Sequence, residues 1–169
     1  MAERPSQLAR EAFIERFGGV FEHSPWIAEA VWDQGLGPDQ DDAAGLHAAM
    51  CRVMRAAPDE AKLRLIRAHP DLAGRLAVAG ALAPASSAEQ ASAGLDRCSP
   101  AEFARFNALN RAYRARFGFP FVTAVRGRSR ADILAEFERR LGNEPEAEFA
   151  EALRQIERIA LLRLQSLLA

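Results

Sequence analysis

Apolar residues recur at helical spacing along nearly the whole chain, and no other feature constrains the fold as strongly. In residues 6–17, for example, Leu8, Ala12, Ile14 and Phe17 repeat with the period of a helix. Glycines and prolines divide this pattern into separate segments. We expect the helices to begin near residues 6, 25, 42, 58, 87, 100, 130 and 144, which gives roughly eight helices.

Capping residues predict where several of these helices begin and end. Ser24 suits the N-cap ahead of Pro25, because proline fits the first helical position. Ser99 and Glu102 have the spacing of a capping box. The same reasoning predicts N-caps at Ser86 or Ser87 (Ser87 with Gln90 also fits a capping box), at Ser129 and at Asn143, and helix ends at Gly18, Gly35 and Gly118.

One apolar stretch does not have helical periodicity. Residues 119–125 follow a glycine, contain Pro120 and are rich in residues that favour extended backbone. No second strand is available to pair with them, so we expect a buried extended segment without a sheet. The predicted fold is therefore an all-α, single-domain helical bundle over residues 1–169, with one short buried extended segment.

Charge and composition exclude several classes of function. The net charge of −1 provides no basic field for nucleic acid or for an acidic membrane surface. No apolar run reaches the length of a membrane span, and residues 1–7 do not resemble a signal peptide. Cys51 and Cys98 lie far apart and are expected to be reduced thiols. We expect a cytoplasmic protein that binds neither nucleic acid nor membranes.

The stretch His69-Pro70-Asp71-Leu72-Ala73-Gly74 is the first candidate for chemistry. Pro70 stops the preceding helix, which places His69 near a helix C-terminus with a fixed exit direction. Histidine exchanges protons near neutral pH, although a lone histidine is more often structural. Residues 71–79 can form a short helix, and residues 80–84 look like a loop.

Two further places are unusual for a plain helical bundle, although each also has a structural explanation. Glu89 and Gln90 stand at an expected helix start, where capping explains them but where they could also bind a small anionic substrate. Arg163 shares a face with Ile156 and Ala160, which predicts a structural salt bridge, a snorkelling side chain or an anion clamp.

The backbone of the extended segment needs hydrogen-bond partners as well. Neighbouring helices can supply them, or the main-chain groups of the segment can form hydrogen bonds with the edge of a flat heterocycle. His23, His47 and His69 lack the spacing of a metal site, so we expect no metal. Phosphate-loop and nucleophile-elbow motifs are also missing from the sequence. These observations predict acid–base and electrostatic chemistry without a bound cofactor.

Several motifs in order give the chain a family resemblance. They are Phe21-Glu22-His23-Ser24-Pro25-Trp26, the His69–Gly74 stretch, Ser86-x-x-Glu89-Gln90 with Ala93-Gly94-Leu95, Asn110-x-x-Tyr113-x-x-Arg116-Phe117-Gly118-Phe119-Pro120-Phe121, and Ala152-Leu153-x-x-Ile156-x-x-Ile159-Ala160-x-x-Arg163-Leu164. In these motifs the chain resembles the OHCU decarboxylases. Members of that family act on 2-oxo-4-hydroxy-4-carboxy-5-ureidoimidazoline in uric acid degradation.

The resemblance implies a cofactor-free helical enzyme, usually a homodimer, that releases CO2 and forms S-allantoin. It implies His69, Glu89 and Arg163 as catalytic residues, with His69 as the proton donor. The substrate-binding residues that it implies are Pro70, Ser86, Ser87, Ala88, Glu89, Gln90, Phe121, Val122, Thr123, Ala124, Val125 and Arg163, with the extended segment contributing backbone contacts. Two alternatives stay open: a non-catalytic helical interaction module, and a lyase of this fold acting on a related ureido or imidazoline carboxylic acid.

Overall fold

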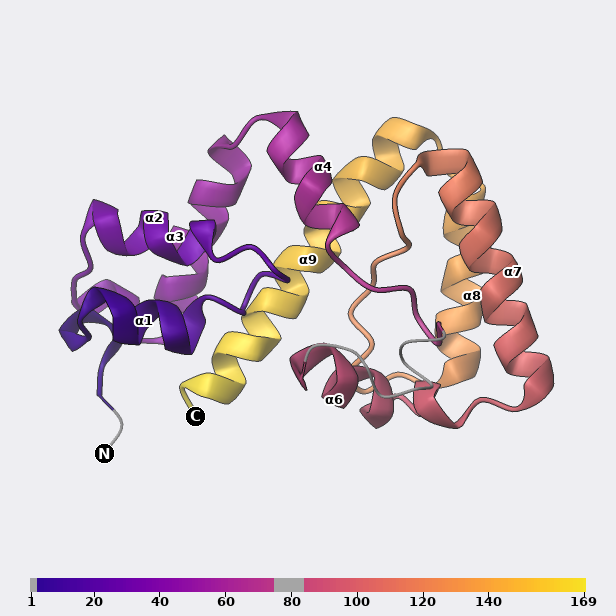
Figure 1. Cartoon of the computed structure of the whole chain (residues 1–169), viewed down its shortest axis with the longest axis horizontal. Helices are drawn as coiled ribbons and strands as arrows, with labels where there is room; N and C mark the ends of the chain where they lie inside the picture. Colours follow the sequence, from indigo (N-terminus) through magenta and orange to yellow (C-terminus); the bar gives the residue numbers. More distant parts are fainter. Residues whose placement is uncertain (1–2, 75–83) are drawn as a thin grey trace. The chain divides into compact units, whose positions relative to one another are not determined.

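The computed structural model describes residues 3–74 and 84–169, and within these ranges the chain is all-α (Figure 1). The prediction of an all-α fold with about eight helices is confirmed. The α-helices are α1 (Arg10–Phe17), α2 (Trp26–Gln34), α3 (Ala43–Ala56), α4 (Asp59–Arg67), α6 (Pro84–Ser92), α7 (Pro100–Phe117), α8 (Arg130–Leu141) and α9 (Pro145–Leu167). Three short 3-10 helices, η1 (Pro5–Gln7), η2 (Pro38–Gln40) and η3 (Leu95–Arg97), complete the described elements.

The chain forms two compact units. Unit 1 comprises Met1–Ala68 and Ile156–Ala169, and unit 2 comprises His69–Gln155. Helix α9 therefore contributes its first part to unit 2 and its remainder to unit 1. Each unit is described by itself below.

Unit 1 has its core between the short N-terminal helices and α3. Phe13 of α1, Ile27 of α2, and Leu46 and Met50 of α3 are all fully buried. Asp42 caps α3, because its side chain accepts a hydrogen bond from the Gly45 amide at 2.7 Å. This carboxylate replaces the helical partner that the first turn lacks.

Cys51 lies on α3 beside His47, but the pair is not an activated thiol. The imidazole Nε2 of His47 is 3.3 Å from the Cys51 Sγ and 2.7 Å from the Glu157 carbonyl oxygen. Because only a protonated Nε2 can bond to that carbonyl, this nitrogen is not a base for the thiol. Burial raises the pKa of Cys51 to about 12.

We therefore expect Cys51 to resist thiol reagents in the folded protein at pH 8, since the thiolate is the reactive form. Cys98 is only partly buried and should react first. A disulfide reagent should label one thiol in native protein and two in urea. A Cys98→Ser variant should lose the native reaction, and rapid labelling of Cys51 in that variant would contradict the prediction.

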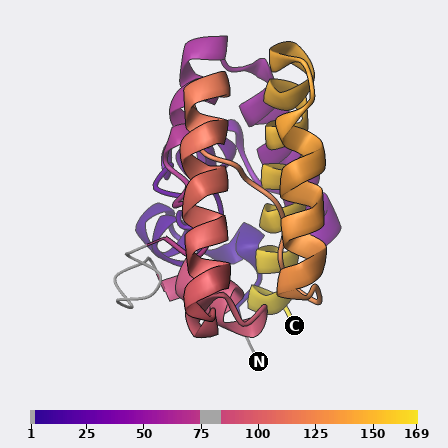
Figure 2. The same cartoon turned by 90° about the vertical axis from the view of Figure 1, so that its right-hand side faces the viewer.

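Unit 2 places α7 and α8 side by side with the extended segment between them (Figure 2). The Tyr113 ring of α7 packs edge-on against Phe119 and Phe121 of the segment and Phe137 of α8, with centroid distances of 5.5–5.9 Å. Phe121 and Phe137 stack with their ring centroids 3.9 Å apart. Every residue of 119–125 is buried, so the predicted buried extended segment is confirmed.

Several predicted caps are confirmed. Ser99 and Glu102 form a reciprocal capping box at the start of α7, with bonds of 3.1 and 3.0 Å. Ser129 and Asp132 do the same at α8. Gly118 ends α7 in the left-handed conformation with φ 78°, which glycine adopts without strain. These short-range signals fix both helices at the residues that the sequence indicates.

One predicted helix start and one predicted cap in unit 1 are wrong. The first α-helix begins at Arg10 and not near Ser6, because the Ser6 amide and hydroxyl both bond to the Asp41 carboxylate at 2.8 Å. Ser24 does not cap α2; its hydroxyl donates to the Glu22 carbonyl at 2.8 Å instead. Helix α2 itself begins at Trp26, next to the predicted start near residue 25.

Two predicted caps in unit 2 are also wrong. Helix α6 already begins at Pro84, so Ser86 and Ser87 lie inside its first turn. Asn143 precedes α9, but its amide donates to the Glu148 side chain at 3.0 Å. Residues 71–74 form a turn and not the start of a helix. The predicted 71–79 helix and 80–84 loop otherwise lie outside the described residues, except for Pro84.

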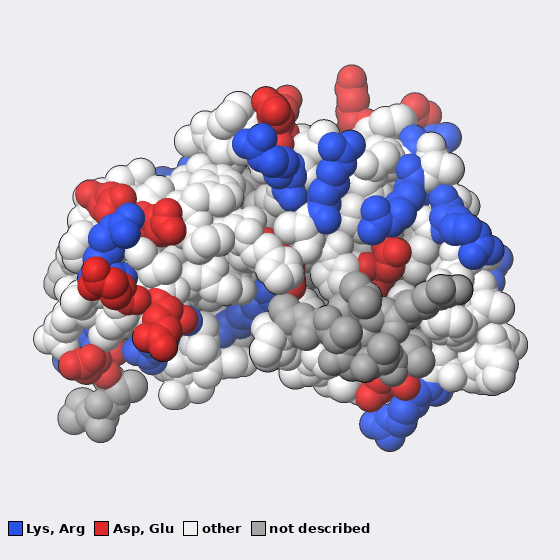
Figure 3. Space-filling model, in the orientation of Figure 1, with Lys and Arg blue, Asp and Glu red and all other residues white. Residues whose placement is uncertain are grey.

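Charges on the surface are mixed in sign. On the face drawn in Figure 3, basic and acidic side chains are intermingled, in keeping with the net charge of −1. Among the described residues, no helix is long and apolar enough to cross a membrane.

Candidate active site

His69 is the first residue of unit 2 and is buried, with only 6% of its surface exposed. Helix α4 ends at Arg67, so His69 stands just beyond a helix C-terminus as predicted. Pro70 follows and fixes the backbone direction. The chain then makes a tight turn over residues 71–74, in which Ala73 has a φ of 52°. This left-handed conformation is unusual for a residue that carries a β-carbon.

Two buried amide side chains hold the 71–74 turn. Gln90 of α6 accepts a hydrogen bond from the Ala73 amide at 3.0 Å and donates to the Asp71 carbonyl at 3.4 Å. Asn110 of α7 donates to the Leu72 carbonyl at 3.1 Å. Three successive residues after Pro70 are therefore each bonded to a side chain from another element, which gives this corner a defined geometry.

Helix α6 carries the candidate residues of the Ser-Glu-Gln motif. Ser86, Glu89 and Gln90 share one face because they are three and four positions apart. Ser86 and Gln90 are buried, Ser87 and Glu89 are half-buried, and Ala88 is exposed. The bonds of Gln90 bring this helix against the turn that follows His69, so the structure joins two of the predicted site segments within unit 2.

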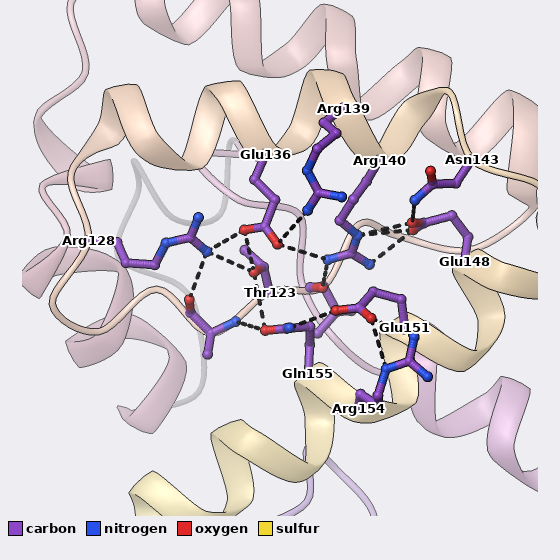
Figure 4. A network of polar contacts seen from close by, with 12 residues as sticks. Thr123, Arg128, Glu136, Arg139, Arg140, Asn143, Glu148, Glu151, Arg154 and Gln155 are labelled. Atoms are coloured by element: carbon purple, nitrogen blue, oxygen red, sulfur yellow. Dashed lines mark hydrogen bonds and ion pairs between the residues drawn. The ribbon is translucent and has the colours of Figure 1, made fainter.

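The extended segment is anchored along one of its two edges (Figure 4). Arg140 of α8 donates to the Val122 carbonyl at 2.7 Å. The Ala124 amide donates to Gln155 of α9 at 3.1 Å, and Arg128 donates to the Ala124 carbonyl at 3.4 Å. The first of the two explanations for this backbone, bonding to neighbouring elements, therefore holds for Val122 and Ala124.

The opposite edge of the segment is formed by the main-chain N–H and C=O groups of the odd-numbered residues. In extended backbone the N–H and C=O of one residue point to one edge, and those of the next residue to the other. Because Val122 and Ala124 face the anchors, Phe121 and Thr123 present their main-chain groups on the opposite side. An edge of this kind can bind the donors and acceptors of a flat ring, which is the second explanation for the segment.

A buried polar network, which the sequence reasoning missed, supports the anchored edge. Arg140 and Glu148 are fully buried and form an ion pair with bonds of 3.0–3.2 Å. Tyr113 donates its hydroxyl to the same carboxylate, and Asn143 donates to it at 3.0 Å. Burial, together with this carboxylate neighbour, raises the pKa of Tyr113, so the phenol stays protonated and remains a donor.

A sequence signal for Arg140 was available. It lies seven residues after Ile133 and three after Phe137, on the buried face of α8. The same argument had identified Arg163. The Arg140 guanidinium also lies over the Phe121 ring, 4.5 Å from its centroid.

Arg163 belongs to unit 1, where it makes a buried salt bridge. Its Nη2 donates to the Glu22 carboxylate at 2.8 Å, and its Nη1 donates to the Gly19 and Val20 carbonyls at 3.3 Å each. Arg163 and Glu22 are 6% and 3% exposed. The structural role considered for this arginine is therefore present, and the bonds hold its guanidinium in a fixed orientation.

The described residues also bear on the kind of chemistry available. Among them, no group of three or more His, Cys, Asp or Glu side chains is arranged to hold a metal ion. Unit 2 contains a buried imidazole, a half-buried carboxylate, hydroxyl and amide groups and a main-chain edge, and the Gln90 amide is bonded to the turn after His69. Such groups transfer protons and bind small polar molecules.

The fold is helical, and its polar groups are of the kinds that acid–base enzymes use. The family model described as OHCU decarboxylase matches residues 6–165. The chain therefore belongs to the OHCU decarboxylase family.

Proteins of known name and structure are similar over nearly the full length. The chain is 41% identical to a 2-oxo-4-hydroxy-4-carboxy-5-ureidoimidazoline decarboxylase of Haloferax volcanii, covering 96% of this chain and 92% of the relative. A protein of the same name from Halalkalicoccus jeotgali is 40% identical, covering 96% and 88%. A crystal structure of (S)-allantoin synthase matches with a TM-score of 0.76 and 32% identity over 96% of this chain, which spans about half (52%) of that structure's chain.

Proposed function

We propose that this protein decarboxylates 2-oxo-4-hydroxy-4-carboxy-5-ureidoimidazoline to (S)-allantoin and CO2 in uric acid degradation. The observation that carries the proposal is the family match over residues 6–165. Relatives that bear this activity in their names are 40–41% identical over almost the whole chain. The similarity to an (S)-allantoin synthase structure supports the same product.

The substrate's own bonds can accept the electrons released with CO2. The bond to the carboxylate breaks, its electron pair forms a C=C bond to the adjacent ring carbon, and the C=N pair moves to nitrogen, which takes a proton. The resulting enol loses its hydroxyl proton while the adjacent carbon gains one. One proton is consumed for each CO2 released, and no electron-accepting cofactor is required.

His69 and Glu89 are the proposed proton-transfer groups. Glu89 accepts a hydrogen bond from the substrate hydroxyl and takes its proton. His69 donates a proton to the ring carbon from one side, which sets the S configuration. The burial of His69 and its exit through Pro70 support this role, because a donor must hold one direction to select one face.

The remaining predicted residues are proposed to bind and orient the substrate. The Arg163 guanidinium attracts the anionic substrate, and Gln90 helps to orient it. Main-chain groups of residues 121–125 contact the ring, with Phe121 and Thr123 presenting the edge opposite the anchors. The other proposed contacts are Pro70, Ser86, Ser87 and Ala88. We further propose that the protein is cytoplasmic and that it forms a homodimer, the usual state for the family. A measurement of its molecular mass in solution would test the homodimer.

The assay that tests the function follows circular dichroism during turnover of freshly made substrate. Urate oxidase and 5-hydroxyisourate hydrolase convert urate to the substrate, and this protein is then added. We expect rapid growth of the (S)-allantoin signal. Slow formation of racemic allantoin, as in spontaneous decay, would contradict the proposal and favour a non-catalytic interaction module. Turnover of only a related imidazoline carboxylic acid would favour a changed substrate.

We expect a Glu89→Gln variant to lose about 10²–10⁴-fold in kcat, because glutamine accepts a hydrogen bond but takes no proton. The measurement is the initial rate in the same assay. Ser92→Ala on the same helix is the matched control, since Ser92 is exposed and its hydroxyl donates to the main-chain carbonyl of Glu89. A fully active Glu89→Gln enzyme would exclude Glu89 as the base.

A further inference from the structure

The turn after His69-Pro70 has a conformation that its own sequence does not favour. Ala73 is fully buried and has φ 52°, in the region that L-residues other than glycine, asparagine and aspartate rarely adopt. A strained residue of this kind persists only where its surroundings enforce it, and such residues cluster at functional sites. The 71–74 turn is therefore held by its neighbours and does not form from local preference.

Asn110 is one of those neighbours, and the hydrogen bonding of its side-chain amide is unusual. Its Nδ2 donates to the Leu72 carbonyl at 3.1 Å, which fixes the amide orientation because a carbonyl only accepts. Its Oδ1 is buried and has no hydrogen-bond partner within the described part of the chain. A buried acceptor without a partner is destabilising. Stability alone does not explain an asparagine at this position, since leucine would fill a similar volume without that defect.

We propose that Asn110 is a positioning residue for His69, an inference that rests on the proposed function. By holding the Leu72 carbonyl, Asn110 fixes the 71–74 turn from α7, while Gln90 fixes it from α6. Pro70 is the only residue between His69 and this turn, and its ring locks φ. The turn is thus coupled to the direction of the imidazole through very few rotatable bonds.

The test is Asn110→Leu in the circular dichroism assay. Leu72 then loses its donor while the unpaired Oδ1 also disappears, so the fold should be retained. We expect kcat to fall by about 10–100-fold with KM unchanged, because a small displacement of a catalytic group slows chemistry without removing a substrate contact. The excess of S over R allantoin should fall as well, which a purely structural role would not cause.

Asn107→Leu is the matched control. Asn107 lies one turn earlier on α7, is half-buried and donates to the Phe103 carbonyl of its own helix at 2.8 Å. It should retain the wild-type rate and stereochemistry. In a His69→Asn background, Asn110→Leu should cause no further loss of rate, because the group that it positions is gone.

Ala73→Gly is the second variant, and it covers the case in which Asn110→Leu does not fold. Glycine adopts the left-handed conformation without strain and leaves the turn freer to move, so it should lower kcat and stereochemical purity at unchanged KM. The proposal is overturned if a folded Asn110→Leu or Ala73→Gly enzyme matches the wild type, or if only KM changes. If the wild-type protein itself forms no (S)-allantoin, the proposed function fails, and this inference fails with it.

Discussion

Replacing His69 by asparagine is expected to lower the decarboxylation rate by about 10²–10⁴-fold, the contribution of a well-placed general acid. Asparagine retains polarity and approximate size, so the substrate should still bind. Allantoin that does form should be closer to racemic, since protonation would then come from water on either face. Initial rates and the circular dichroism of the product measure both effects in one experiment.

His23→Asn is the matched control for this prediction. The His23 side chain is 67% exposed, and its φ of 46° is one that asparagine adopts readily. This variant should be as active and as stereoselective as the wild type. A His69→Asn enzyme with the wild-type rate and pure S product would remove His69 from the mechanism.

Replacing Arg140 by methionine is expected to lower the free energy of unfolding by about 3–5 kcal/mol, as is typical when one partner of a buried ion pair is removed. Glu148 would keep its charge in a fully buried position without the guanidinium. The Val122 carbonyl would also lose its donor. Urea unfolding followed by circular dichroism measures the change.

Two further variants separate the buried pair from a general effect of charge. Arg139→Met removes a 65% exposed neighbour whose ion pair with Glu136 spans 3.6 Å, and it should change stability by less than about 1 kcal/mol. Arg140→Met combined with Glu148→Leu should recover part of the loss, because no uncompensated charge remains. An Arg140→Met protein as stable as the wild type would show that the pair is not needed for folding.

Helix ends were predictable where the signal is local. The capping boxes at Ser99 and Ser129 involve residues three positions apart, so the pattern alone locates the starts of α7 and α8. The extended segment was predictable for a similar reason, since residues 119–125 lack helical periodicity. Burial of this apolar stretch followed from the absence of a polar face.

Predictions failed where a competing hydrogen bond takes a side chain away from the expected role. Ser6 bonds to Asp41 and Asn143 bonds to Glu148, and neither pairing is visible in a local pattern. The burial of Arg140 could have been inferred from its spacing, but its buried partners Glu148 and the Val122 carbonyl could not, because they come from other elements. The left-handed Ala73 is also invisible in the sequence, where alanine gives no signal of positive φ.

The sequence predicts which residues belong to the candidate site more fully than it predicts how they are arranged in space. His69, Glu89 and Gln90 were selected from residue type and position, and the structure joins Gln90 to the turn after His69. Asn110 carried no assigned role, because an asparagine inside a long helix looks like any other polar position. The catalytic and binding roles themselves stay predictions for the assays described above.

The anchored segment has a consequence for how freely this region can vary. Its fixed points are main-chain atoms of Val122 and Ala124, held by Arg140, Gln155 and Arg128. Main-chain atoms are the same in every amino acid, so these anchors do not depend on the side chains of Val122 and Ala124. The Thr123 hydroxyl adds a side-chain anchor, because it donates to the Glu136 carboxylate at 3.0 Å. Tolerance to mutation should therefore be low at the three side chains that hold the main chain, and low within the segment as well, because every residue of 119–125 is buried.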